Sequence, residues 1–121
     1  MKNLISYGKQ FIDASDINEV IKVLKGQNIT QGPYVKKFED EFKKKFKCKY
    51  ALAVSSGTAA LHMAFILCGI KKNDEIISSP ITAEPTNISI LQAGGKVKFA
   101  DVNPLTGNLD PKSVEKKINS L

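Results

Sequence analysis

The feature that most constrains the fold is an alternation of short apolar runs with longer helical patterns, which begins at residue 50. The expected strands are residues 50–54, 74–79 and 96–102, and the expected helices are residues 57–68, 85–94 and 110–121. Strands that alternate with helices at this spacing predict an α/β fold with a largely parallel sheet. Such a sheet needs both faces covered, and three units are too few to cover one. We therefore expect the chain to be the first part of a longer protein.

Residues 1–49 show a different pattern, that of two amphipathic helices joined by a polar loop. Residues 13–25 carry a single apolar stripe, and Asp13 is a suitable N-cap for a helix there. Pro33 stands where the first residue of a helix tolerates a missing N–H. The apolar face of this second helix carries Val35, Phe38, Phe42 and Phe46. The chain is thus expected to have two parts, residues 1–49 and residues 50–121.

The net charge of +6 raises the question of nucleic-acid binding, but all 18 basic residues are lysine. Arginine is the residue that reads bases and binds phosphates with two parallel hydrogen bonds. The densest basic run, residues 36–49, also contains acids, and these stand four residues before lysines, the favourable order for helical ion pairs. The expected pairs join Glu39, Asp40 and Glu41 to Lys43, Lys44 and Lys45. We interpret the run as a solvated helix face and rank a basic nucleic-acid-binding domain below it.

The sequence also bears on the compartment. The longest apolar stretch is interrupted by His62 and ends at Gly69, so it is too short to span a membrane. The first residues have no apolar signal core. Cys48 and Cys68 fit neither a zinc nor a redox spacing, and no metal site is expected. These observations favour a cytoplasmic protein with reduced cysteines that binds neither membranes nor nucleic acid.

The junction "SSGT", residues 55–58, joins an expected strand to an expected helix. The first N–H groups of a helix have no intrahelical acceptor, and together with the helix dipole they favour an anion. Gly57 allows a ligand to approach the backbone, and the hydroxyls of Ser56 and Thr58 can add donors. A phosphate site is one interpretation, and an ordinary helix cap is the other. The helix itself is apolar almost all round, which predicts that it is buried.

Longer stretches carry a family resemblance. Residues 55–82, "SSGTAALHMAFILCGIKKNDEIISSPIT", and residues 93–118, "AGGKVKFADVNPLTGNLDPKSVEKKI", resemble the DegT/StrS-type sugar-nucleotide aminotransferases, and most closely their pseudaminic acid branch of 4-aminotransferases. The similarity is nearly collinear over residues 5–121. It implies the type I fold of pyridoxal 5′-phosphate (PLP) enzymes, with this chain as the N-terminal part of the large domain.

The resemblance implies roles for particular residues. Ser56, Gly57 and Thr58 would hold the cofactor phosphate, with Gly57 and Thr58 donating backbone N–H groups. The positions that match the nucleotide-sugar site are Tyr7, Gln27, Asn28, Ile29 and Thr30. Without the family, Tyr7 would be read as a surface tyrosine and residues 27–30 as a polar loop.

The segment "ITAEPTNIS", residues 81–89, departs from the family pattern. Family members often have an aromatic residue that stacks on the pyridoxal ring, and Ala83 stands at that position. Ala83, Thr86 and Asn87 are expected to border the cofactor without such stacking. Alternatively, these three residues only form the start of a helix, where small and capping residues are favoured.

The resemblance implies that the intact enzyme transfers an amino group from a donor such as glutamate to a nucleotide-linked keto sugar, for amino-sugar and polysaccharide biosynthesis. Transamination needs a lysine that binds the cofactor covalently and a carboxylate beside the pyridine nitrogen. In the family both lie downstream of the matched region, so no catalytic residue is assigned, and these 121 residues are expected to be inactive and not stably folded alone. A homodimer is implied. The alternatives are a sugar dehydratase of the same family and a stand-alone phosphate- or nucleotide-binding α/β module.

Other polar residues rank lower as candidates. His62 is expected to be a satisfied core histidine. Asp101 follows the third expected strand, where α/β sheets bind ligands, but a role in capping the next turn is slightly favoured. Asp74 and Glu75 are expected to be solvated loop acids.

Overall fold

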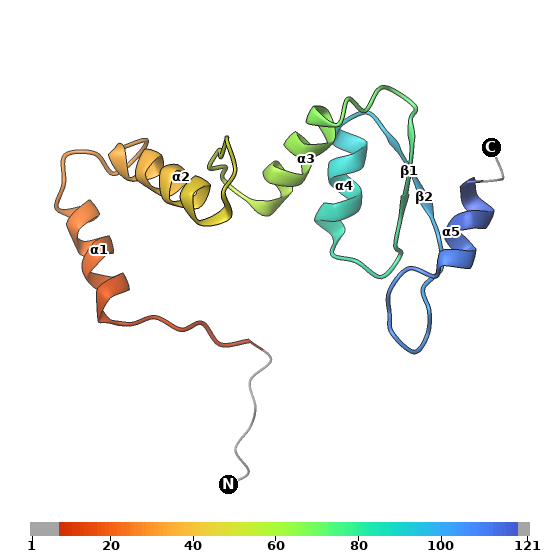
Figure 1. Ribbon diagram of the computed structural model, residues 1–121, viewed down its shortest axis with the longest axis horizontal. Coiled ribbons are helices and arrows are strands. Elements are labelled where there is room, and N and C mark those ends of the chain that lie inside the picture. Colours follow the sequence, from red (N-terminus) through yellow and green to blue (C-terminus); the bar gives the residue numbers. More distant parts are fainter. Residues whose placement is uncertain (1–7, 119–121) are drawn as a thin grey trace, which may run out of the picture. The chain divides into compact units, whose positions relative to one another are not determined.

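The computed structural model describes residues 8–118, and the chain divides into two compact units, Met1–Ala53 and Val54–Leu121. Helices α1 and α2 belong to the first unit (unit 1), and the remaining helices and both strands belong to the second (unit 2) (Figure 1). None of the described helices is both long and apolar enough to cross a membrane. Each unit is described by itself below.

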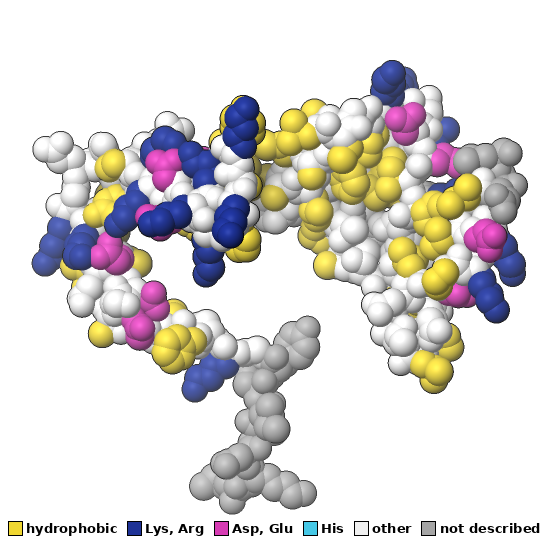
Figure 2. Space-filling view, in the orientation of Figure 1, with side chains coloured by type: hydrophobic (Ala, Val, Ile, Leu, Met, Phe, Trp, Pro, Cys, Tyr) yellow, Lys and Arg dark blue, Asp and Glu magenta, His cyan; other side chains and the backbone are white. Residues whose placement is uncertain are grey.

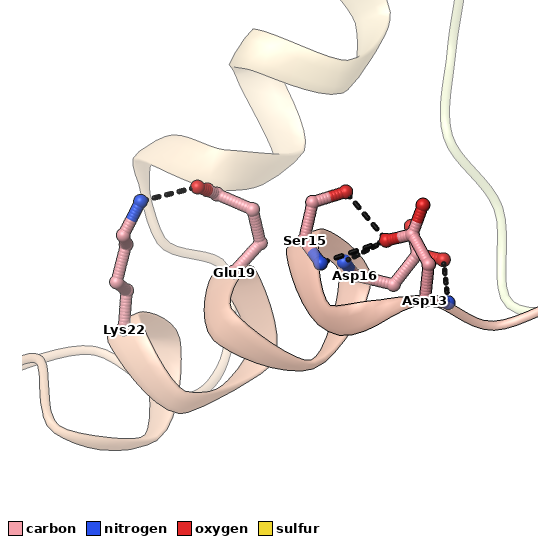
Figure 3. Close-up of polar contacts among 5 residues, drawn as sticks. All are labelled: Asp13, Ser15, Asp16, Glu19 and Lys22. Carbon is pink, nitrogen blue, oxygen red and sulfur yellow. Dashed lines mark hydrogen bonds and ion pairs between the residues drawn. The ribbon is translucent and has the colours of Figure 1, made fainter.

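Helix α1, Ala14–Leu24, begins with a complete capping box (Figure 3). The Asp13 carboxylate accepts hydrogen bonds from the N–H groups of Ser15 and Asp16, at 2.7 and 3.1 Å. The Asp16 carboxylate in turn accepts one from the Asp13 N–H at 3.0 Å. The Ser15 hydroxyl and these N–H groups stabilise the charged form and hold the pKa of Asp13 below its ordinary value. The expected helix and its cap are confirmed.

Helix α2, Pro33–Phe46, begins at the expected proline and ends at Lys47, whose left-handed backbone has a φ of 53°. Its aromatic stripe is in contact along the helix, since the ring centroids of Phe38 and Phe42 lie 6.1 Å apart and those of Phe42 and Phe46 lie 4.4 Å apart. All three rings are exposed to solvent. The stripe is therefore formed as expected, but within the described residues nothing buries it.

The ion pairs of α2 differ from those expected. Asp40 pairs with Lys36 one turn before it and with Lys43 one turn after it, and these two lysines hold the pKa of Asp40 below its ordinary value. Glu39 accepts a hydrogen bond from the Ala53 N–H at 2.9 Å. A carboxylate that bonds a backbone N–H is fixed in place, so the regular ladder expected from spacing alone is not formed.

Residues 50–54 were expected to be a strand, and the structure shows none there. Strands are stabilised by ladders of hydrogen bonds to a neighbouring strand. Within the described chain the backbone of this segment has no such neighbour, and the Ala53 N–H bonds the side chain of Glu39. The strand predicted from the apolar pattern of residues 50–54 is therefore wrong for the structure described here, because an apolar pattern does not supply the pairing partner that a strand needs.

Unit 2 contains a β-α-β arrangement made by β1 (Glu75–Ser78), α4 (Glu84–Gln92) and β2 (Lys96–Phe99). The strands pair in parallel, with Glu75 opposite Lys96 and Ser78 opposite Phe99 (Figure 1). Helix α3 (Gly57–Leu67) packs on α4, and α4 packs on β2. Helix α5 (Pro111–Ile118) follows a turn. The predicted α/β fold with a parallel sheet is confirmed.

The core of unit 2 is small and centres on α4 and β2. Ile90 and Ala100 are 1% exposed. Gly95 is buried between α4 and β2, where a Cβ atom would collide with the Cδ1 of Ile76 and lie 3.1 Å from the Cγ2 of Ile90. Glycine avoids these contacts, since any larger residue would force the Ile76 and Ile90 side chains to shift.

Helix α3 was expected to be buried, and the structure contradicts this. None of its residues is buried, and Leu67 is 81% exposed. Hydrophobic side chains accordingly gather at the surface of unit 2 (Figure 2). The helix has apolar residues on every side, but only the side that faces α4 is covered within the described residues.

Candidate functional site

The turn at the start of α3 has the geometry of an N-capped helix. Ser56 has an extended backbone, with φ −161° and ψ 163°, and its Oγ accepts a hydrogen bond from the Ala59 N–H at 3.1 Å. The Ala60 N–H bonds the carbonyl oxygen of Ser56 at 3.1 Å. Both interpretations from the sequence agree with this arrangement, because a capped helix start is also an anion site when its other donors remain open.

Two donors do remain open. In the described part of the chain, the N–H groups of Gly57 and Thr58 have no protein acceptor. A Cβ atom placed on Gly57 would meet nothing within 4 Å, and the backbone there is not left-handed. The fold itself therefore does not require glycine at this position. Two unpaired N–H groups at a helix N-terminus can bind a phosphate, and Gly57 adds no side chain that would obstruct its approach.

Helix α4 contributes a second set of polar side chains. The hydroxyl of Ser78, at the end of β1, donates to the Oδ1 of Asn87 at 2.6 Å. The hydroxyls of Thr82 and Thr86 lie 3.0 Å apart and share one hydrogen bond. These contacts fix Thr86 and Asn87, both half-buried, on the first turn of α4.

One contact joins the two sets. The Oγ of Ser89, on α4, lies 3.2 Å from the carbonyl oxygen of Thr58, on α3. Ser89 is one turn after Thr86 and is fully buried. The structure thus brings the Ser56-to-Thr58 turn beside the helix that carries Thr86 and Asn87.

Ala83 is the N-cap residue of α4, and its side chain makes no capping hydrogen bond. The carbonyl oxygen of Ala83 accepts a hydrogen bond from the Thr86 N–H at 3.0 Å. Pro85 in the first turn and the small, exposed Ala83 fit the interpretation of a helix start. Ala83 offers no aromatic ring to a ligand, and its predicted place beside the cofactor stays a prediction.

The residues predicted for the substrate side belong to unit 1. Gln27 and Asn28 line a shallow surface pocket together with Lys22 and Tyr34, between the end of α1 and the start of α2. Ile29 and Thr30 are exposed in the same loop. Tyr7 lies outside the described residues. The loop residues are therefore close to one another, and they lie in a different unit from the Ser56-to-Thr58 turn.

Two of the lower-ranked residues, His62 and Asp101, differ from their predictions. His62 is half-buried and not a core residue. Asp101 does not cap the turn with its side chain, because Asn103 does so by accepting the Leu105 N–H. Asp101 acts through its backbone, where its N–H donates to the Ser113 hydroxyl at 2.8 Å.

The acids before the second expected strand also behave differently from one another. Glu75 is part of β1 and pairs across the sheet with Lys98 at 3.0 Å, so it is not a loop acid. Asp74 remains in the loop, where its carboxylate accepts the Lys71 N–H at 2.8 Å.

Sequence reasoning missed two buried serines, Ser78 and Ser89, which are 6% and 0% exposed. A signal was available for Ser89, because it lies three residues after Thr86 and hence on the same side of α4. No comparable signal marks Ser78, whose role depends on how β1 and α4 pack. The described residues contain no cluster of three His, Cys, Asp or Glu side chains that could hold a metal ion. Cys48 and Cys68 are free and exposed.

The donor set of the α3 turn fits the phosphate of a cofactor such as PLP. Two open N–H groups lie at one helix N-terminus, Ser56 and Thr58 in the same turn carry hydroxyls, and Gly57 adds no side chain that would obstruct a ligand. The described residues show no lysine or carboxylate that the contacts place at the same turn.

Comparison with known proteins connects this geometry to a family. The profile of the DegT/DnrJ/EryC1/StrS aminotransferase family matches residues 10–121. The chain is 37% identical over 113 residues to the spore coat polysaccharide biosynthesis protein SpsC of Bacillus subtilis. It is 36% identical over 115 residues to a UDP-4-amino-4,6-dideoxy-N-acetyl-beta-L-altrosamine transaminase of Campylobacter jejuni. These matches cover 93% and 95% of the chain but only 29% and 30% of the two relatives.

A solved structure gives the same result. GDP-4-keto-6-deoxy-D-mannose-3-dehydratase of E. coli, with bound hydrated PLP, superposes with a TM-score of 0.78 at 32% identity. The superposition covers 89% of this chain and 29% of that one. The α/β fold described above is accordingly that of part of a type I PLP enzyme. On the match of its profile over residues 10–121, the chain belongs to the DegT/DnrJ/EryC1/StrS aminotransferase family.

Proposed function

We propose that this chain is the N-terminal part of a PLP-dependent aminotransferase that acts on a nucleotide-linked keto sugar. The family match and the transaminase among the relatives support the reaction class. The observation in the structure that carries the proposal is the pair of N–H groups at Gly57 and Thr58, which have no acceptor among the described residues, at the capped start of α3. In this proposal residues 1–49 form a helical segment on the substrate side, and residues 50–121 form the first units of the PLP-binding domain.

In this proposal Ser56, Gly57 and Thr58 bind the cofactor phosphate. Phosphate is doubly charged near neutral pH, and both the helix dipole and the two N–H groups stabilise that charge. The hydroxyl of Ser56 already accepts the Ala59 N–H, so its own proton is available to donate to a phosphate oxygen. The cofactor, when bound, supplies the electron sink that transamination needs.

The start of α4 borders the cofactor in this proposal through Ala83, Thr86 and Asn87. Asn87 is held by Ser78 and Thr86 by Thr82, so both side chains are oriented before any ligand arrives. Preorganised groups lose less conformational freedom on binding and therefore bind more tightly. Ala83 leaves space where an aromatic residue would otherwise stack.

The nucleotide sugar is proposed to contact Tyr7 and the loop of Gln27, Asn28, Ile29 and Thr30. Gln27 and Asn28 support this by lining a surface pocket with amide groups, which can both donate to and accept from sugar hydroxyls. An amino acid such as glutamate is the proposed amino donor. We also propose that the enzyme is a cytoplasmic homodimer, as the family resemblance implies, and that these 121 residues without further chain do not catalyse transamination.

A sugar dehydratase of the same family is the second candidate. The superposition on the E. coli dehydratase, at 32% identity, supports this second candidate. Nothing in the described residues separates the two reactions, because both use the same cofactor phosphate site. Product analysis distinguishes them, since only transamination leaves an amino group on the sugar.

The proposed phosphate site is tested by filling the space in front of Gly57. In the protein expressed from its complete reading frame, Gly57→Val adds a branched side chain whose Cβ atom meets no atom of the fold within 4 Å. We expect the variant to fold normally and to lose PLP binding, measured by equilibrium dialysis and cofactor absorbance. Ala64→Val, at an exposed position two turns along the same helix, is the matched control. A Gly57→Val protein that binds PLP as tightly as the unchanged protein would contradict the proposal.

The reaction itself is tested with the same protein. Loaded with PLP and glutamate and supplied with UDP- or GDP-linked 4-keto sugars, it should yield an aminated nucleotide sugar that mass spectrometry detects. A deoxygenated sugar without a new amino group would instead support the dehydratase.

A further inference from the structure

The peptide unit between Thr58 and Ala59, in the first turn of α3, is held from both sides. Its N–H, which belongs to Ala59, donates to the Oγ of Ser56 at 3.1 Å. Its carbonyl oxygen, which belongs to Thr58, lies 3.2 Å from the Oγ of Ser89. Ser56 precedes the helix, whereas Ser89 comes from α4, 31 residues away along the chain. The orientation of this peptide is therefore fixed by two serines from different elements.

Ser89 is fully buried, and its hydroxyl has two acceptors within reach. Its single proton is shared between two carbonyl oxygens, that of Pro85 at 2.6 Å and that of Thr58 at 3.2 Å, and the contact with Pro85 is the shorter. Serine often makes the first kind of contact, back to the preceding turn of its own helix. That local bond does not account for the approach to α3, which depends on how the two helices pack.

The hydroxyl of Ser89 is not needed to satisfy either carbonyl group. Pro85 and Thr58 each lie four residues before another residue of the same helix, so each carbonyl oxygen can accept an N–H of its own helix. An alanine at position 89 would also fill nearly the same space. Removing the hydroxyl should therefore cost little stability, and a role in stability alone does not explain why a polar group is buried at this contact.

We propose that Ser89 is a positioning residue for the cofactor phosphate, a proposal that rests on the function proposed above. By holding the Thr58 carbonyl, it fixes the tilt of the first turn of α3. That tilt sets the direction in which the N–H groups of Gly57 and Thr58 point. Ser89 also connects this turn to α4, the helix that carries Thr86 and Asn87. This contact keeps constant the distance between the phosphate donors and these two residues, which are proposed to border the rest of the cofactor.

The test compares two ligands that differ only in the phosphate. In the protein expressed from its complete reading frame, Ser89→Ala should weaken binding of PLP about fivefold. This is the change in affinity that corresponds to the loss of one ordinary hydrogen bond. Binding of pyridoxal, which lacks the phosphate, should change much less. The matched control is Ser113→Ala, which removes a serine hydroxyl from α5 in the same unit, where it accepts the Asp101 N–H.

Amide hydrogen exchange provides an independent readout of the peptide itself. Ser89→Ala should speed exchange in a peptic fragment that covers residues 56–60 and leave a fragment from the far end of α3 unchanged. Ser89→Cys, which keeps a weak donor of similar size, should restore part of both effects. It also keeps the test informative if the alanine variant folds poorly.

The outcomes separate the two proposals. A PLP-to-pyridoxal affinity ratio that is equal in Ser89→Ala and the unchanged protein would overturn the positioning role. If the unchanged protein shows no preference for PLP over pyridoxal, the proposed phosphate site fails, and exchange at residues 56–60 alone decides whether Ser89 holds the turn. Equal exchange in both proteins would then overturn the positioning role as well.

Discussion

The two units of this chain are built from different kinds of contact. Unit 1 has two amphipathic helices whose caps and ion pairs join residues at most four apart, and none of its described residues is buried. Unit 2 has its packing between elements, with α3 on α4 and α4 on β2, and its polar contacts join residues as far as 31 apart. Local sequence therefore determines the first unit, while tertiary packing determines the second.

The largest expected effect breaks the core that only unit 2 possesses. Ile90 is 1% exposed, and Ile90→Ala should lower the free energy of unfolding of unit 2 by about 2–5 kcal/mol, through lost apolar burial and the cavity left behind. Ile17→Ala, at a residue of α1 that is 53% exposed, is the matched control and should have a much smaller effect. Urea titration followed by circular dichroism measures both. Similar losses at the two positions would show that unit 1 is buried against something that the structure does not describe.

A second comparison concerns the two helix caps. Ser56→Ala removes a cap from α3, which packs on α4, and typically costs about 1 kcal/mol. Asp13→Ala removes the capping box of α1, whose stability rests on local contacts. Backbone chemical shifts should therefore show the greater loss of helix in α1. Equal loss in both helices would contradict the difference between the units.

The smallest expected effect is a pH dependence at the start of α1. The folded-state pKa of Asp13 is lowered by hydrogen bonds from Ser15 and Asp16. A lowered pKa means that the cap stabilises the helix above the ordinary pKa of aspartate and loses this effect as the pH falls through the folded-state value. Chemical shifts of α1 should therefore report fraying at acidic pH, below about 4. In Asp13→Asn, whose side chain at position 13 cannot titrate, the same pH change should cause less fraying at the start of α1, where the Asp16 carboxylate of the capping box remains.

The units also differ in how much of them the sequence predicted. In unit 1 the cap at Asp13 and the proline at the start of α2 were both found, because each signal lies within one turn of the feature it marks. The ion pairs of α2 were predicted wrongly. One reason is that the Glu39 carboxylate accepts a hydrogen bond from the Ala53 N–H. The spacing of charged residues along a helix shows which ion pairs are possible. It does not show which other groups, distant in the sequence, bond the same carboxylates.

In unit 2 the order and type of the elements were predicted, but not what covers them. The alternation of apolar runs was sufficient to predict the parallel pair β1 and β2. The burial of α3 was predicted wrongly, because an apolar helix shows only that it needs partners and not which partners are present. Within the candidate site the turn at Gly57 was found from residue types, whereas Ser89 depends on the packing of α4 on α3.

The pairing of β1 with β2 has a consequence for handling these 121 residues without further chain. Each strand is paired on one side only among the described residues, so the sheet presents two open edges of backbone donors and acceptors. Open edges are templates for adding strands from other molecules, and they favour aggregation. Strand β2 carries Lys96 and Lys98, whose charges discourage such stacking, whereas the middle of β1 is Ile76 and Ile77. Intermolecular growth should therefore begin at the β1 edge.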